Sequence, residues 1–234
     1  MGKWYGIRKG YDLNKKEAVF AKIETEWEAA KQLVVGINKS VHGVSPEYKS
    51  FKNEKDALAY IKSKDYLVKG EDELPVDAIH CYVDGSSSSE LNNYSCGIVY
   101  VLDGKILHLE KTAGKNKEAA AMQQIGGELL GAMKAMTYAK SVNAQDIIIF
   151  FDYKGVALHA LGVWERSNEF SKVYYDWCQK FFRENPQMRV QFCKVDAHTG
   201  DDFNEIADGL AKQALDIRPD KIFFDMMRKH GQIA

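Results

Sequence analysis

Two short, almost wholly apolar segments that each end in an aspartate constrain the fold most strongly. Ala78 to Asp84 reads AIHCYVD, and Gln145 to Asp152 reads QDIIIFFD. Apolar runs of this length are typical of strands buried on both faces, which occur in sheets covered by helices on each side. Because reactive groups gather beyond the carboxyl ends of such strands, we expect Asp84 and Asp152 to lie close together.

The segments around these two strands predict an α/β domain. A hairpin is expected at Asp103-Gly104, a strong two-residue turn signal between two apolar runs. A long Ala-, Met- and Leu-rich helix is predicted over residues 117–140, a strand over 189–195 and a last helix over 203–215. This order predicts a mixed five-stranded sheet with helices on both faces, spanning residues 78–216. Residues 217–234 form a C-terminal tail.

A smaller module is predicted over residues 1–63. Strand patterns occur at 3–8, 17–23 and 48–51, and helices are expected after Thr25 and Asn53, which are candidate N-caps. The result is a small α+β domain, a three-stranded antiparallel sheet with two helices. Residues 64–77 (KDYLVKGEDELPVD) lack a clear period and are interpreted as a short linker.

Charge is divided unevenly between these parts. The whole chain carries −1, but residues 1–64 hold 13 Lys and Arg against 8 Asp and Glu, a net +5. The remainder holds 19 against 25, a net −6. A basic N-terminal part suits attraction to phosphates, although ordinary charge scatter on a solvated surface is an equally good interpretation.

The cysteines and the hydropathy indicate a soluble, reduced setting. Four cysteines are widely spaced without a CxxC pair, which argues against a zinc site and for buried thiols. No apolar run approaches the roughly 18 residues that span a membrane, and the N-terminus lacks the apolar core of a secretory signal. We therefore expect a cytoplasmic protein without membrane contact.

Two further acids lie in settings that are unusual for solvated residues. Glu128 lies in the apolar helical segment QIGGELLGAM, and Asp208 lies early in the last predicted helix. Taken singly, Asp84 could form a turn, Asp152 could cap a helix, Glu128 could be solvated and Asp208 could complement the helix dipole. If the four met, they would need a cation, and carboxylates alone select Mg²⁺, with Mn²⁺ as a substitute. Two such ions about 3.5–4 Å apart can promote phosphodiester hydrolysis.

These acids lie in segments that resemble the type 1 ribonuclease H family. The matching segments are YVDGS, GGELLGA, FFDYKGV and VDAHTGDDFNEIADGLAKQA, within residues 78–215. The resemblance implies a ribonuclease H-like sheet and an endonuclease that cuts the RNA strand of RNA/DNA hybrids, leaving 5′-phosphate and 3′-hydroxyl ends. It implies two metal ions held by Asp84, Glu128, Asp152 and Asp208.

The same resemblance implies further site residues. His198, in the loop DAHTGDD, would be an auxiliary group that moves protons or helps product leave, whereas a lone loop histidine is otherwise simply exposed. Many family members have Asn or Ser where Gln124 stands, and the region after Asp152 lacks a basic substrate-holding segment. The implied contacts with nucleic acid are Gly85, Ser86, Gln124 and Asn204.

The N-terminal module resembles the hybrid-binding, viroplasmin-like domain. The likeness is carried by WYGIRKG, by a helix-start Trp in TEWEAA and by the strand YKSF. It implies that Tyr5, Lys49 and Ser50 face the duplex and that Trp27 and Tyr48 stack on deoxyribose, although both aromatics could instead be core residues. Double-stranded RNA is a further candidate ligand, and a monomer is expected.

Two other functions stay open at this point. One is a non-catalytic protein that binds RNA/DNA hybrids or double-stranded RNA on the same scaffold. The other is an integrase- or transposase-like enzyme that cuts DNA. Mg²⁺-dependent release of fragments from a labelled hybrid would exclude the first, and cutting of an all-DNA duplex would favour the second.

Overall fold

The computed structural model describes residues 3–88, 93–196 and 200–233, and the chain divides into two compact units. The first unit is Met1–Lys64 and the second is Asp65–Ala234. Buried apolar clusters lie within each unit, so each has a core of its own. The two units are therefore described separately.

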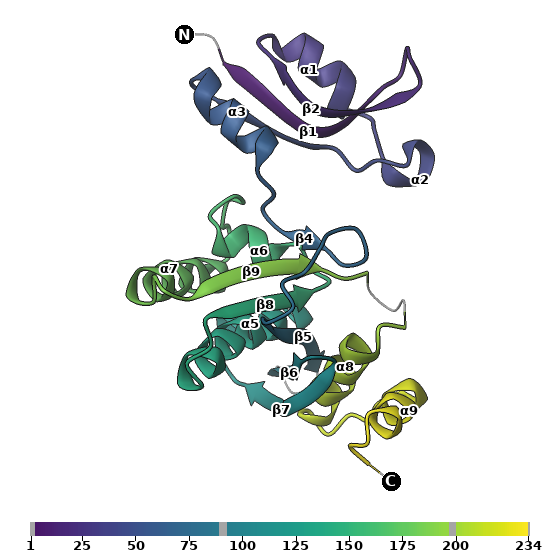
Figure 1. The fold of residues 1–234 in the computed structure, drawn as a ribbon, viewed down its shortest axis with the longest axis vertical. Coiled ribbons are helices and arrows are strands. Elements are labelled where there is room, and N and C mark those ends of the chain that lie inside the picture. Colours follow the sequence, from purple (N-terminus) through teal and green to yellow (C-terminus); the bar gives the residue numbers. More distant parts are fainter. Residues whose placement is uncertain (1–2, 89–92, 197–199, 234) are drawn as a thin grey trace. The chain divides into compact units, whose positions relative to one another are not determined.

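The first unit is a three-stranded antiparallel sheet with helices packed on it (Figure 1). The strand order is β2-β1-β3, which confirms the predicted small α+β fold. Ile7, on the central strand, is fully buried and packs with Ala30, Leu33 and Val34 of the first helix. The elements are β1 (Trp4–Asp12), β2 (Glu17–Glu24), α1 (Trp27–Val34), α2 (Lys39–His42), β3 (Glu47–Phe51) and α3 (Glu54–Lys62).

The N-terminal capping residues predicted for the two helices of this unit can be compared with the structure. Asn53 caps α3 as predicted, because its side chain accepts a hydrogen bond of 2.9 Å from the backbone of Asp56. The prediction for Thr25 is wrong: Glu26 is the N-cap residue of α1 and makes no side-chain capping bond. The short α2 was not predicted, and Asn38 caps it through the backbone of Val41.

The second unit is built on one mixed sheet in the order β4-β9-β8-β5-β6-β7. Strand β5 lies between β8, to which it is parallel, and β6, to which it is antiparallel. The mixed ribonuclease H-like sheet was predicted, but it has six strands rather than five. The strands are β4 (Leu67–Val68), β5 (Ile79–Ser88), β6 (Asn93–Leu102), β7 (Lys105–Gly114), β8 (Asp146–Phe151) and β9 (Arg189–Lys194).

The sixth strand comes from the segment interpreted as a linker. Leu67 and Val68 pair in parallel with Cys193 and Lys194 of β9. A strand of two residues leaves too short a pattern to be recognised in a sequence. The segment after Lys64 is thus part of the second unit rather than a free connection.

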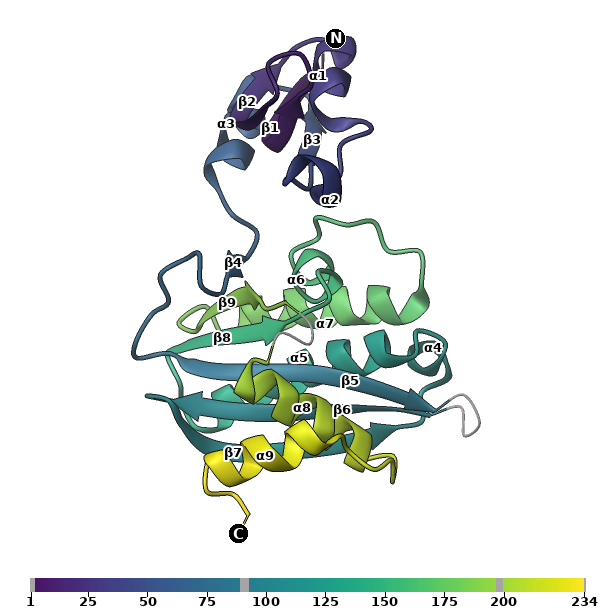
Figure 2. The ribbon, with the colours of Figure 1, turned by 90° about the vertical axis from the view of Figure 1, so that its right-hand side faces the viewer.

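Helices cover both faces of this sheet and create two cores. Figure 2 shows α8 and α9 on one face and α5 and α7 on the other. Alternate side chains of β8 enter the two cores: Ile147, Ile149 and Phe151 on one side, Ile148 and Phe150 on the other. The helices are α4 (Lys117–Ala120), α5 (Gln124–Ser141), α6 (Gly155–Ala160), α7 (Glu169–Glu184), α8 (Asp202–Gln213) and α9 (Lys221–Lys229).

Two local features refine the sequence-based expectations. Asp103 and Gly104 both have positive φ, 50° and 73°, as the predicted hairpin turn requires. The single helix predicted over residues 117–140 is instead two helices. They are separated at Gln123, whose φ of 55° cannot continue a right-handed helix.

Two further predictions concerned the cysteines and the possibility of a membrane-spanning helix. All four cysteines are buried and unpaired, as predicted. Within the described part of the chain, no helix is both long and apolar enough to cross a membrane.

Candidate active site

The pairing of β5 with β8 places two of the predicted acids at one edge of the sheet. Tyr82 of β5 is the register partner of Phe150 of β8, and the two strands run in the same direction. Two residues further along each chain are Asp84 and Asp152. Asp152 directly follows the last residue of β8. Contrary to the sequence-based prediction, Asp84 is not at the end of its strand, because β5 continues to Ser88 beside β6; both carboxylates lie just beyond the last pair between the two parallel strands.

A close approach between glycines brings Glu128 to the same place. A Cβ atom at Gly85 of β5 would lie 1.9 Å from the backbone oxygen of Gln124. One at Gly127 of α5 would lie 1.9 Å from the backbone oxygen of Ser95. Only glycines allow this contact between helix and sheet. Glu128 follows directly and is buried, with only 3% of its surface exposed.

A second close approach positions Asp208 from the opposite face of the sheet. Gly97 of β6 is the register partner of Asp84. A Cβ atom at Gly97 would lie 2.0 Å from the backbone oxygen of Ala207 in α8. The residue after Ala207 is Asp208, so α8 presents this carboxylate beside the strand position that carries Asp84.

The electrostatics show that the four acids interact. Burial, followed by the charges of Asp152 and Asp208, raises the pKa of Asp84 well above its ordinary value. Burial, followed by the charges of Asp152 and Asp84, raises the pKa of Glu128 well above its ordinary value. Such mutual repulsion in a buried setting favours neutralisation, either by protons or by a cation.

Hydrogen bonds hold two of these carboxylates in place. The backbone N–H of Tyr153 donates to Glu128 Oε2 over 3.3 Å. The backbone N–H of Gly85 donates to Asp84 Oδ1 over 2.7 Å, and this bond counteracts part of the rise in the pKa of Asp84. The acids that β5 and α5 contribute are therefore oriented by neighbouring backbone groups.

Lys212 is a site residue that the sequence analysis missed. Its ammonium lies 2.7 Å from Asp208 Oδ2 and 2.6 Å from Asp220 Oδ2. Burial alone would lower the pKa of Lys212, but the hydrogen bonds with Asp208 and Asp220 raise it. The available signal was the Asp–Lys spacing of four residues on one helix, which places two side chains on the same face.

The donor set fits a hard divalent cation in its chemistry. It offers only carboxylate oxygens, the ligands that Mg²⁺ and Mn²⁺ prefer. A cation would also relieve the repulsion that raises the pKa of Asp84 and Glu128. Among the described residues, no three His, Cys, Asp or Glu side chains are already close enough to form a complete metal-binding group, and Asp208 is engaged by Lys212.

The remaining predicted residues of this domain have different settings. His198 lies outside the described residues. Gln124 is exposed at the first position of α5, and Ser86 is half-buried on β5. Asn204 is only 5% exposed, and its side-chain oxygen is buried without a hydrogen-bond partner in the described structure.

The predicted binding residues of the first unit form an aromatic surface cluster. The ring of Trp27 lies 5.5 Å from that of Tyr5 and 6.1 Å from that of Tyr48. Trp27 is 36% exposed and Tyr48 is 42% exposed, so neither is a core residue. The neighbouring Lys49 and Ser50 on β3 are also exposed. We call Tyr5, Trp27, Tyr48 and Ser50 the aromatic surface of the first unit. Lys49 alternates to the other face of β3, where its ammonium lies 6.0 Å from the ring of Phe51.

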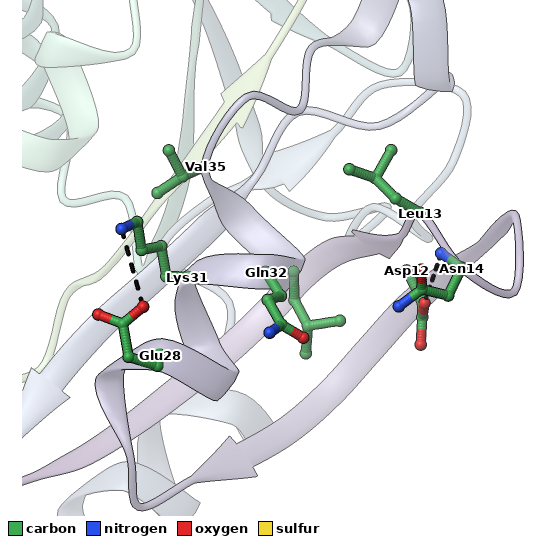
Figure 3. A pocket seen from close by; sticks show the side chains of 8 residues that line it. Asp12, Leu13, Asn14, Glu28, Lys31, Gln32 and Val35 are labelled. Atoms are coloured by element: carbon green, nitrogen blue, oxygen red, sulfur yellow. Dashed lines mark hydrogen bonds and ion pairs between the residues drawn. The ribbon is translucent and has the colours of Figure 1, made fainter.

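A pocket elsewhere in the first unit has no predicted role. It has a volume of about 480 Å³ and lies between α1 and the end of β1 (Figure 3). The ion pair between Lys31 and Glu28, at 3.8 Å, borders it. None of the predicted site residues lines it; the lining residues are Asp12, Leu13, Asn14, Glu28, Lys31, Gln32, Leu33 and Val35.

Comparison with known proteins identifies relatives of the second unit. A family model described as RNase H matches residues 77–216. The structure is similar to RNase H1 from Halobacterium salinarum (23% identity, TM-score 0.49, 59% of this chain and 98% of that one). It is also similar to LC11-RNase H1 in complex with an RNA/DNA hybrid (17% identity, TM-score 0.48, 59% of this chain and 96% of that one). A third similar structure is the N-terminal RNase H domain of Rv2228c from Mycobacterium tuberculosis (20% identity, TM-score 0.46, 59% and 95%). No curated protein matches the sequence.

Proposed function

Because the chain belongs to the ribonuclease H family, we propose that it hydrolyses the RNA strand of RNA/DNA hybrids with the help of two divalent cations. The products would carry 5′-phosphate and 3′-hydroxyl ends. The observation that supports this most directly is the electrostatic coupling of Asp84 with Asp152 and Asp208, and of Glu128 with Asp84 and Asp152. This coupling supports a common site for carboxylates that come from β5, α5, the residue after β8 and α8.

Each carboxylate has a distinct position in the proposed mechanism. Asp84 is coupled to three other acids, which suits the central position between two cations. Glu128, Asp152 and Asp208 would complete the binding groups. When bound, the cations would supply an activated water and charge neutralisation at the departing 3′-oxygen. The carboxylates come from the sheet, from the end of β8 and from two helices packed on the sheet, so the reacting phosphate would meet a prepared arrangement.

Recognition of RNA would come from the surface beside these acids. Gly85, Ser86, Gln124 and Asn204 are proposed to contact 2′-hydroxyls or base edges, the groups that distinguish RNA from DNA. Gly85 and Asn204 are buried in the free protein, so their contacts require a local rearrangement on binding. Gln124 is exposed at the start of α5, three helical positions before Gly127. We propose that His198 assists proton transfer or product release.

The first unit is proposed to bind the hybrid without cutting it. Its aromatic surface presents exposed rings, the exposed Lys49 lies on the same edge strand, and the unit carries a net charge of +5. Aromatic faces stack on sugars or bases, and basic groups attract phosphates. Tyr5 and Ser50 are register partners on adjacent strands, so they share one face of the sheet. Double-stranded RNA is a second proposed ligand of this unit.

The test replaces Asp152 by Asn. Mg²⁺-dependent release of labelled RNA fragments from a hybrid should fall by at least about 100-fold, because the change removes a negatively charged ligand oxygen at the site. Hybrid binding, measured by fluorescence anisotropy in EDTA, should persist. Asp146→Asn is the matched control, since Asp146 is at the other end of the same strand and pairs with Arg189. Retained cleavage by Asp152→Asn would refute the proposed site, and cutting of an all-DNA duplex by the wild type would favour a different nuclease.

A further inference from the structure

We propose that Lys212 and Asp220 form a clamp on Asp208 that positions this carboxylate and sets the affinity of the active site for divalent cations. The inference rests on the proposed function, because it treats Asp208 as a metal-binding residue. Lys212 is a positioning residue here, since it acts through Asp208. The clamp connects the active site to the start of the C-terminal helix α9.

The geometry of the clamp is a chain of two ion pairs. Lys212 lies one helical turn after Asp208 on α8, and its ammonium contacts Asp208 Oδ2 at 2.7 Å. The same ammonium contacts Asp220 Oδ2 at 2.6 Å. Asp220 is the N-cap residue of α9. One ammonium is therefore shared between an active-site carboxylate and a carboxylate on a different helix.

The two ion pairs of the clamp differ in how far they are exposed to solvent. The side chain of Asp208 is 16% exposed and that of Lys212 is 23% exposed, whereas that of Asp220 is 70% exposed. The pair between Lys212 and Asp208 is thus the better shielded from solvent. Lys212 also acts on Asp84, because its charge lowers the pKa of that carboxyl against the larger effects of burial and of Asp152 and Asp208. Its ammonium consequently influences two of the four acids.

The anchoring of α9 keeps Asp220 in place. Phe223 and Met227 of α9 are buried in the core that α8 shares with the sheet. Phe223 also lies against Gly209, the residue after Asp208, where a Cβ atom would be 2.0 Å from the ring. Packing of α9 therefore fixes the backbone at Asp220, and the ion pair with Lys212 holds its exposed side chain.

The clamp affects cation binding in a direction that depends on which end is changed. A cation that binds Asp208 competes with the Lys212 ammonium for Oδ2. Removing the ammonium removes this competitor and makes the site more negative, so the cation should bind more tightly. Removing the charge of Asp220 leaves the Lys212 ammonium paired with Asp208 alone. The cation then competes with a stronger ion pair for Oδ2, so it should bind more weakly. Structural damage would weaken binding in both variants.

The experiment measures Mn²⁺ binding to the full chain without nucleic acid, by electron paramagnetic resonance of the free ion. For Lys212→Met we expect a Kd about two- to fivefold lower than in the wild type, a range that follows from the energy of a partly exposed ion pair. For Asp220→Asn we expect a Kd higher by a similar factor. Thermal unfolding in EDTA checks that both variants are folded.

Two control variants remove charges of α9 other than that of Asp220. Lys221→Met removes the cation next to Asp220, and Asp225→Asn removes an acid of α9 that pairs with Arg228. Both should leave the Kd within about 1.5-fold of the wild type, because charges on an exposed surface are well screened.

The outcomes separate this inference from the proposed function. Opposite shifts for Lys212→Met and Asp220→Asn, absent from the controls, would support the clamp. Shifts in the same direction, or none, would overturn it, while wild-type binding that Asp152→Asn weakens would still support the proposed metal site. No Mn²⁺ binding by the wild type would overturn both.

Discussion

Replacing Gly127 by Ala tests whether the contact between helix and sheet determines activity. The added methyl group would lie 1.9 Å from the backbone oxygen of Ser95 and 2.9 Å from Cα of Gly85. Both obstacles are backbone atoms of adjacent strands, so they cannot move aside as a side chain can. The helix α5 must therefore withdraw from the sheet, and Glu128 must move with it.

The size of the effect follows from these distances. Real Cβ contacts are essentially never shorter than 3.0 Å, so the contact with Ser95 must open by at least about 1 Å. A displacement of about 1 Å in a catalytic group costs on the order of 100-fold in rate. Overpacking of this kind also destabilises a protein by about 1–3 kcal/mol, and the helix propensity of alanine offsets about 1 kcal/mol of this cost.

The assay is single-turnover cleavage of a labelled RNA/DNA hybrid, with thermal unfolding alongside it. Gly131→Ala is the matched control on the same helix. The methyl group there would lie 3.2 Å from Cβ of Val83, a side-chain atom that needs to move by only a few tenths of an ångström. We expect Gly127→Ala to lose about 100-fold in rate and Gly131→Ala to stay near the wild type. Equal rates in the two variants would refute the argument from close approach.

Two further predictions concern the first unit and the C-terminal helix. Trp27→Ala and Tyr48→Ala should each weaken hybrid binding by about 1–3 kcal/mol, the contribution of one stacked ring, while Phe20→Ala should not, although Phe20 is more accessible, with 62% of its surface exposed. Anisotropy titrations would reveal a purely structural role if all three variants behaved alike. Burial acts to raise the pKa of Asp202, but hydrogen bonds from Lys229 and His230 lower it overall from 3.8, so its ionised form stabilises the fold above pH 3.8 and this contribution is lost as the pH falls through the lower folded-state pKa. Asp202→Asn should therefore flatten the acid side of the stability profile in urea unfolding, and an unchanged profile would contradict the assignment.

The sequence was most informative where one residue determines a local geometry. The apolar runs before Asp84 and Asp152 predicted adjacent buried strands, because only strands covered on both sides tolerate so few polar residues. The pair Asp103-Gly104 predicted the hairpin, because few residues accept positive φ at both turn positions. Glu128 and Asp208 became candidate partners mainly through the family resemblance, since their helical patterns alone do not show which side of the sheet they occupy.

The features that escaped prediction depend on tertiary contacts. Strand β4 is two residues long and exists because the edge of β9 offers unpaired backbone groups. The interruption at Gln123 has no glycine or proline to signal it. Lys212 appeared to be an ordinary surface lysine, because its second partner, Asp220, lies beyond the end of the helix on a segment with no predicted role.

Strand β5 has a consequence for the way the enzyme tolerates heat. It lies in the interior of the sheet, its side chains enter both cores, and it carries Asp84, the proposed central metal ligand, in its middle. Backbone amides in such a position exchange with solvent only when the whole unit opens. Asp84 therefore belongs to the most persistent part of the second unit. Warming should abolish activity together with the global melting of the second unit, with no earlier inactive stage.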